Sequence, residues 1–262
     1  SFPTRRSSDL SGCGGGSQNG TTGTTDQSTA NTQTEGPAAR AAAGELNVGI
    51  AQDLDSSLDP HKTVKAGTRE VMFNVFEGLL KPDASGNLNP AVAESYTVSE
   101  DHLLYTFKLR AGVKFHNGQT VTAEDVVYSI NRCAAVPEGQ EKPLVAAFSA
   151  VKSVEALDEK TVTVTIAQRD LEFISYMTAA IIPADYENQD TAPVGTGPFK
   201  FVSWDTAGGM IVLERNTDYY GKVPSIERIV YKTVAVESTK ALMLRSGEAD
   251  LAWLNAKYAR TF

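Results

Sequence analysis

The side chains able to do chemistry in this chain are few and widely separated. The three histidines, His61, His102 and His116, follow no metal-ligand spacing. His61 comes directly after Asp59 and Pro60, and we interpret it as a turn or cap residue rather than a ligand contact. No hydrolase triad and no nucleophile–base pair can be read from the sequence. The sequence therefore predicts no catalytic residue, no metal site and no cofactor.

Two short patterns resemble ion or phosphate sites but lack essential parts. Asp53, Asp55 and Asp59 are spaced like the start of a calcium loop, but the required Gly and the distant bidentate Glu are missing. We interpret these three as turn acids. Gly195 and Gly197 would suit a phosphate cradle, but neither a Lys–Ser/Thr pair nor a helix follows them. We expect the two glycines to shape a turn.

Cys13 is the residue for which the sequence suggests a covalent modification. Leu10, Ser11 and Gly12 precede it and a tract rich in Gly, Ser and Thr follows, a pattern that resembles the lipobox of bacterial lipoproteins. In that class the cysteine is diacylated and begins the mature chain, so the resemblance implies a lipid anchor at Cys13. Cys133 instead continues an apolar helical pattern and is expected to be a small buried residue.

The first 43 residues are expected to lie outside the folded body. Residues 1–12 lack the apolar run of a secretory signal and read like a translated sequencing adapter in place of a lost signal peptide. Residues 13–43 are poor in aromatics, so they cannot bury enough apolar surface to offset chain entropy, and we expect a disordered linker. As a flexible leash, this linker would reach roughly 30 Å.

The charge of the chain excludes some partners. Its 262 residues carry a formal charge of −8, and the first 43 contribute no net charge, so the whole excess is on the body. Nucleic-acid binding needs basic patches, and direct docking on anionic lipid needs them too. No stretch of 18 or more apolar residues follows Cys13, so no membrane-spanning helix is expected.

The elements that would position any site alternate between short strands and helices. Apolar residues at helical spacing predict a helix over 68–80 whose core face includes Phe73, and a capping pattern at Thr122 starts another. A third helix is expected over 237–245. The predicted strands are 46–51, 105–109, 151–156, 161–166, 198–204, 210–215, 226–233 and 250–254. The pattern is mixed α/β with many antiparallel pairs.

An ordered set of short motifs resembles one known family. The motifs are SLDPH (57–61), NVFEGLL (74–80), PAVAES (90–95), YTFKLRAGVKFHNG (105–118), VTAEDVVYS (121–129), PVGTGPF (193–199), LERN (213–216) and SGEAD (246–250). Their order and spacing resemble the family 5 extracellular solute-binding proteins of ABC transporters, the group with oligopeptide-, dipeptide- and nickel-binding members. The resemblance runs from about residue 45 to residue 254.

That resemblance implies an α/β, periplasmic-binding-protein-like two-lobed fold (type II, cluster C). Residues 44–82 and 184–262 would form two parts of the first lobe, and residues 83–183 a subdomain inserted into it. The second lobe of the family would then be missing, so we expect this chain to be an N-terminal fragment.

The resemblance also places the ligand. In the oligopeptide binders an exposed strand-like segment holds the peptide by backbone hydrogen bonds, and this segment corresponds to Val64, Lys65 and Ala66. The same comparison puts Trp253 and Leu254 on the cleft floor. A tryptophan there could cover a ligand, although a plain core position is an equal alternative for Trp253.

The function implied is that of a lipid-tethered receptor. It would capture oligo- or dipeptides outside the cell and deliver them to the permease and ATPase complex of an ABC importer, working as a monomer. One alternative is a receptor for a nickel chelate or another small solute. Another is a truncated fragment that binds nothing, because half a cleft offers half the contacts. A secreted enzyme is disfavoured, since no nucleophile–base pair is present.

Overall fold

The computed structural model describes residues 44–50 and 54–259. Cys13, the adapter-like residues 1–12, the linker 13–43 and Asp53 lie outside the described residues, so the predictions made for them are not addressed by the fold. None of the helices in the described part is long and apolar enough to cross a membrane.

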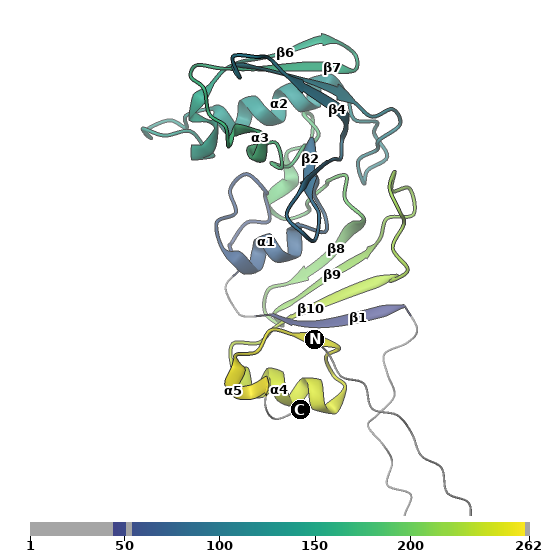
Figure 1. Cartoon of the computed structure of the whole chain (residues 1–262). Helices are drawn as coiled ribbons and strands as arrows, with labels where there is room; N and C mark the ends of the chain where they lie inside the picture. Colours follow the sequence, from purple (N-terminus) through teal and green to yellow (C-terminus); the bar gives the residue numbers. More distant parts are fainter. Residues whose placement is uncertain (1–43, 51–53, 260–262) are drawn as a thin grey trace, which may run out of the picture. The chain divides into compact units, whose positions relative to one another are not determined.

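A five-stranded mixed sheet gathers the two ends of the described chain (Figure 1). Its strand order is β11-β1-β10-β9-β8, with β1 at Glu45–Ile50, β8 at Phe199–Asp205, β9 at Met210–Arg215, β10 at Arg228–Thr233 and β11 at Leu251–Ala252. The first strand runs parallel to both β10 and β11, whereas β8, β9 and β10 pair antiparallel. The earliest strand is therefore held by strands that come at least 170 residues later in the chain.

A second, antiparallel sheet is built from the middle of the chain. Its order is β4-β5-β7-β6, formed by Ala93–Val98, Leu104–Leu109, Thr161–Ile166 and Val151–Asp158. Helix α2 (Ala123–Ala134) packs against it, and this helix begins with a full capping box between Thr122 and Asp125. Cys133 on this helix is buried as expected, and burial raises the pKa of its thiol to about 12.

The remaining elements are shorter than α2. They are α1 (Ala66–Met72), β2 (Leu80–Pro82), β3 (Leu88–Pro90), the 3-10 helices η1 (Ala146–Ala150) and η2 (Asn188–Asp190), α3 (Phe173–Tyr176), α4 (Glu237–Ser246) and α5 (Ala256–Ala259). Of these, β2 and β3 pair as a separate two-stranded sheet. Each of the two larger sheets has its own apolar core. One core centres on Phe107 and Phe173, and the other joins α1 to β1, β9 and β10 through residues such as Val71 and Ile211.

Helix α1 is shorter than the sequence predicts. It ends at Met72 instead of continuing to residue 80, because the next carbonyls bond to a distant loop. The Asn74 carbonyl accepts from Phe199 N at 3.1 Å, and the Val75 carbonyl accepts from Gly197 N at 2.9 Å. Phe73 follows the last residue of α1 with a helical backbone and lies on the side of the helix opposite Val71 and Met72, so the prediction that Phe73 is a core residue is wrong.

The Gly195 and Gly197 pair makes this contact possible. A Cβ atom on Gly195 would come within 2.2 Å of the Val75 carbonyl oxygen, and one on Gly197 within 2.6 Å of the Asn74 oxygen. Only glycine allows two backbones to approach so closely. The sequence predicts that these glycines shape a turn, whereas in the structure they lie in a loop without an assigned turn and allow it to pack closely on the chain after α1.

Candidate functional site

Helix α1 buries one side and exposes the other. Gly67, Thr68, Val71 and Met72 face the core. Residues at positions 66, 69, 70 and 73 recur at the spacing of one helical face, and Ala66, Arg69 and Phe73 are exposed on it. Phe73 keeps 61% of its surface exposed, and Val64, just before the helix, keeps 71%. We call residues 64–73 on this side the α1 ridge.

Trp253 lies against the α1 ridge. Its indole Nε1 donates a hydrogen bond to Glu70 Oε1 at 2.9 Å, and 67% of its surface remains exposed. A core position for Trp253 is thereby excluded. Leu254 follows it and is half-buried. The fold thus brings Trp253 to Glu70, on the helix that follows the 64–66 segment, although the two parts of the chain are almost 190 residues apart.

The backbone of the 64–66 segment is partly occupied within the protein. Asp55 Oδ2 accepts from Val64 N at 3.2 Å and from Lys65 N at 3.0 Å. The Lys65 ammonium donates to the Leu54 carbonyl at 2.7 Å. Two backbone donors expected to face a ligand are therefore bonded to a side chain. The exposed surface of the segment consists mainly of the side chains of Val64 and Ala66. This geometry therefore favours ligand contacts through side chains over contacts through backbone hydrogen bonds alone.

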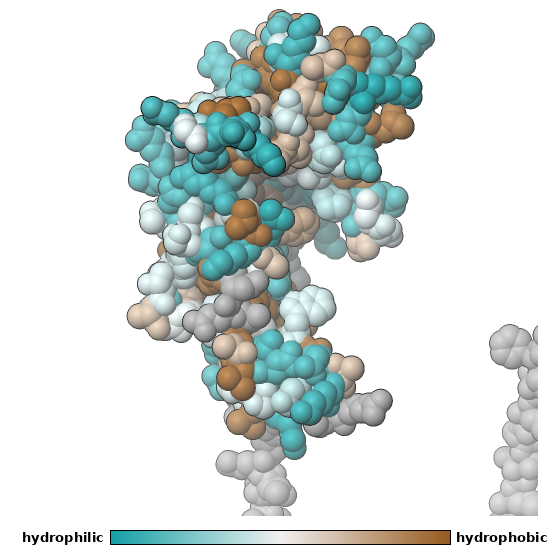
Figure 2. Space-filling view, turned by 90° about the vertical axis from the view of Figure 1, so that its left-hand side faces the viewer, coloured by the Kyte–Doolittle hydropathy of each residue, from teal (hydrophilic) through white to brown (hydrophobic). Residues whose placement is uncertain are grey.

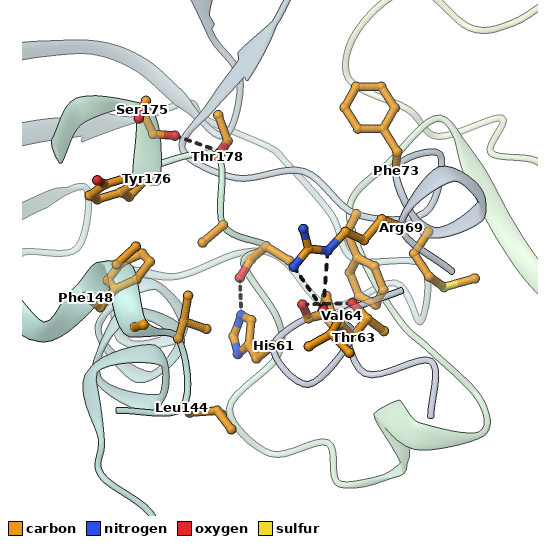
Figure 3. Close-up of a pocket in the computed structure, with 18 residues that line it drawn as sticks. His61, Thr63, Val64, Arg69, Phe73, Leu144, Phe148, Ser175, Tyr176 and Thr178 are labelled. Carbon is orange, nitrogen blue, oxygen red and sulfur yellow. Dashed lines mark hydrogen bonds between the residues drawn. The ribbon is translucent and has the colours of Figure 1, made fainter. Parts of the chain in front are cut away.

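A cavity of about 590 Å³ opens beside the α1 ridge (Figure 3). One wall is formed by the 60–64 segment with Arg69 and Phe73, and the opposite wall by residues 144–148 and by Tyr176 near the end of α3. Most of the lining is apolar. Figure 2 shows hydrophobic patches among polar side chains on this side of the molecule.

A closed polar network lies at the base of the cavity. The Arg132 guanidinium forms an ion pair with Asp59, and its Nη1 also donates to His61 Nδ1 at 2.8 Å. The other ring nitrogen of His61 donates to the Ala180 carbonyl at 2.8 Å. This network ties the segment before α1 to α2 of the second sheet.

The network sets the protonation of its members. Burial is the main cause that lowers the pKa of His61 to about 4, so the ring is neutral and His61 has a structural role larger than the turn or cap predicted for it. Burial alone would raise the pKa of Asp59, but the hydrogen bond and charge of Arg132 outweigh it and hold the pKa below its usual value.

The other two histidines lie elsewhere. His116 donates from Nε2 to the Gly197 carbonyl at 3.0 Å, and burial lowers its pKa to about 4. His102 sits in a turn with a positive φ of 58°. Within the described ranges, no group of three or more His, Cys, Asp or Glu side chains is placed to hold a metal ion.

The arrangement of these residues has the features of a binding surface. It combines exposed aromatic and aliphatic side chains, a mostly apolar cavity and a rigid polar base. Pockets of this kind bind small molecules by burying their apolar parts and fixing a few polar groups. The class of protein that these features define is a solute-binding protein of mixed α/β fold.

The family follows from comparison with known sequences. The model of the bacterial extracellular solute-binding proteins, family 5 Middle, matches residues 87–262. The chain belongs to this family, as its motifs predicted. The fold is that of the type II periplasmic binding proteins, also as predicted.

Individual relatives and structures agree with that assignment. The chain is 32% identical to the glutathione-binding protein GsiB of Escherichia coli O1:K1 over 220 residues, which cover 81% of this chain and 42% of GsiB. The structure of AgaA from A. tumefaciens R10 in complex with agropinic acid matches with a TM-score of 0.76 and 34% identity, over 83% of this chain and 45% of AgaA. DppA from Helicobacter pylori, in complex with the peptide STSA, gives 0.74 and 28%, over 83% and 48%.

The chain therefore spans less than half the length of the relatives it matches. These relatives are solute-binding receptors and not enzymes. Sequence reasoning missed Arg69, Glu70 and Phe73 as surface residues near the site. The sequence signal for these residues was their spacing along one helical face. The predicted helix over 68–80 instead placed Phe73 on the core face, so this spacing was not recognised.

Proposed function

We propose that this chain supplies one face of the ligand cleft in a receptor that captures peptides or peptide-like solutes for an ABC importer. The observation that carries the proposal is the mostly apolar cavity lined by Val64 and Phe73, both exposed, beside the helix to which the exposed Trp253 donates a hydrogen bond. Concave, mostly apolar sites with a few polar groups are typical of ligand binding.

The dimensions of the site support a small ligand. A volume of about 590 Å³ falls within the roughly 300–1,000 Å³ typical of small-molecule pockets. The hydrogen bond to Glu70 restrains the indole of Trp253, which lowers the entropy lost when the ring packs on a ligand. We propose five ligand-contacting residues, acting through side chains more than backbone donors: Val64, which lines the cavity, and Lys65, Ala66, Trp253 and Leu254, which are not among its lining residues.

We further propose how this chain fits a longer receptor. Residues 44–82 and 184–262 would form the first lobe around the five-stranded sheet, and residues 83–183 the inserted subdomain around the four-stranded sheet. The remaining length of the relatives would supply the second lobe. Closure of that lobe over the α1 ridge by a hinge motion would give the form that a permease reads.

The proposed cellular setting completes this picture. A lipid attached to Cys13 would hold the receptor at the outer face of a membrane, and the 13–43 linker would let the body reach its permease as a monomer. The family to which the chain belongs is extracellular by description, which supports a location outside the cytoplasm.

The test is a binding measurement on the complete product of the gene that encodes this chain. Calorimetric titration with di-, tri- and tetrapeptides should give saturable binding. The variants Trp253→Ala and Phe73→Ser should each weaken it at least tenfold, because each removes apolar surface from the ligand face. Leu157→Ser is the matched control, since Leu157 is 62% exposed on the distant β6 strand, and it should bind like the unaltered protein.

Two results would count against the proposal. If no peptide binds but a nickel–histidine chelate does, the receptor serves the alternative ligand class. If Trp253→Ala and Phe73→Ser bind as tightly as Leu157→Ser, the α1 ridge is not the ligand face.

A further inference from the structure

The charge inside the cavity is unusually simple. Of the 18 lining residues in the described part of the chain, Arg69 is the one with a formal charge, and no aspartate or glutamate is among them. His61 also lines the cavity, but its Nε2 is bonded to Ala180 and its ring is neutral. An apolar cavity with a single cation has a strong preference for the charge of whatever enters it, because Coulomb interactions strengthen as water is excluded.

Arg69 has much unused hydrogen-bonding capacity. A guanidinium carries five N–H groups. Two of its nitrogens, Nε and Nη2, approach the Thr63 carbonyl, both at 3.4 Å, which is long for N–H···O bonds. Among the described residues, no carboxylate lies within ion-pair distance of Arg69. Lys62 and Arg132, which border the same segment, are instead paired with Asp190 and Asp59.

The position of the guanidinium is fixed by its helix. Arg69 and Phe73 are one turn apart on the exposed side of α1, so a ligand that packs on the phenyl ring lies within reach of the cation. Figure 3 shows the guanidinium directed from α1 toward the 61–64 segment, inside the ring of lining side chains.

We propose that Arg69 binds a free carboxylate of the ligand, and that the receptor selects solutes combining an apolar body with such a group, for which a peptide C-terminus is the model. The assignment rests on the proposed function of the α1 ridge. A planar guanidinium can hold a carboxylate through two parallel hydrogen bonds, which no neutral amide can reproduce. Because Arg69 is the one formally charged side chain among the described lining residues, it would also set the ligand's direction, with the ligand's carboxylate at α1.

The experiment compares each peptide with its own C-terminal amide. The complete gene product is titrated with Ala-Leu, Ala-Leu-Ala and Ala-Leu-Ala-Ala and with the three matching amides. The unaltered protein should bind the free acids at least tenfold more tightly. In Arg69→Gln this preference should fall below threefold, through loss of affinity for the acids alone, and Arg69→Lys should restore part of it by returning the charge without the planar fork.

The matched control is Arg245→Gln, an exposed arginine in the last turn of α4 that is absent from the cavity lining. It should keep the full preference for free acids. Circular dichroism and melting temperature should match the unaltered protein for all three variants, because Arg69 and Arg245 are both exposed.

The outcomes separate this inference from the proposed function. If peptides bind and Arg69→Gln weakens the binding of acids and amides equally, or weakens the binding of neither, then Arg69 does not bind the carboxylate. The receptor function would still stand. If no peptide binds the unaltered protein in either form, the peptide-receptor proposal fails and the assignment of Arg69 falls with it.

Discussion

Two neighbouring stretches, residues 59–61 and the α1 ridge, differ in the burial and pairing of their side chains. At residues 59–61, Asp59 and His61 are almost fully buried, and the side-chain oxygens and nitrogens of both residues have hydrogen-bond partners. A few residues later, at the α1 ridge, Val64 and Phe73 stand in solvent and Arg69 has no carboxylate partner among the described residues.

Polar groups in the first stretch stabilise the fold, whereas polar groups in the second remain available for binding. A buried charge is stable only when it is paired and hydrogen-bonded, so Asp59, His61 and Arg132 form a closed set. An exposed cation beside exposed apolar surface has no such requirement, and its remaining donors stay free for a ligand. If this comparison is right, changes in the first stretch should alter stability, and changes in the second should alter binding.

The largest expected effect comes from breaking the buried ion pair. In Arg132→Met, the Asp59 carboxylate is left in a buried site without its main partner, and His61 loses a hydrogen bond. Removing one member of a buried pair costs about 3–5 kcal/mol. Urea denaturation at pH 7 should therefore show a free energy of unfolding lower by about that amount.

Lys62→Met gives the matched control. Lys62 also approaches Asp59, at 3.6 Å, but 43% of its side chain is exposed, and pairs of this kind contribute less than about 1 kcal/mol. An Arg132→Met protein as stable as Lys62→Met would show that the network is not the stabilising element described above.

A somewhat smaller effect is expected from pH. His61 has a pKa of about 4 in the folded protein against about 6.5 for a histidine in water, so the unfolded chain binds more protons between these values. The contribution of neutral His61 is complete above pH 6.5 and is lost as the pH falls toward 4. Between pH 7.5 and 4.5 this loss is on the order of 2–3 kcal/mol.

Denaturation across this range separates the histidines. In His61→Gln the fall in stability on acidification should be smaller by that amount, because glutamine does not titrate. His116 has the same folded pKa of about 4, so His116→Gln should flatten the profile as well and the double variant most. An unchanged slope in the double variant would contradict the view that both rings are buried and neutral.

Much of the fold was predictable because local signals and tertiary packing agree. The capping pattern at Thr122 is a complete capping box, and the hairpin expected over 151–166 is β6 paired with β7. Strand β4 was missed because five of its six residues are exposed, so the strand shows no alternation of buried and exposed positions. Helix α1 was extended too far because the partners of the Asn74 and Val75 carbonyls are more than 120 residues away.

The candidate site was less accessible to sequence reasoning. The 64–66 segment and Trp253 came from family resemblance, and only the fold shows that Trp253 is exposed and bonded to Glu70. The sequence offers for Arg69 only its place on one helical face, and a solvated arginine on a helix is ordinary. Arg69 differs from other exposed arginines because the residues that face it across the cavity, 144–148 and 175–180, include no acidic side chain. The hydrophobic periodicity of the sequence cannot reveal that arrangement.

The smallest effect gives the sharpest comparison, because it uses one residue type on both sides of α1. Val71 is fully buried in the core of the five-stranded sheet, whereas Val64 is 71% exposed. Truncating a buried valine to alanine removes two methyl groups and leaves a cavity, at a cost of about 2 kcal/mol, part of which the better helix propensity of alanine offsets. The free energy of unfolding of Val64→Ala should stay within about 0.5 kcal/mol of the unaltered protein.

Peptide titration should give the reverse order, with weaker binding in Val64→Ala and unchanged binding in Val71→Ala under conditions where both are folded. A Val64→Ala protein that loses stability but keeps its affinity would place the 64–66 segment with the buried network instead of the ligand face.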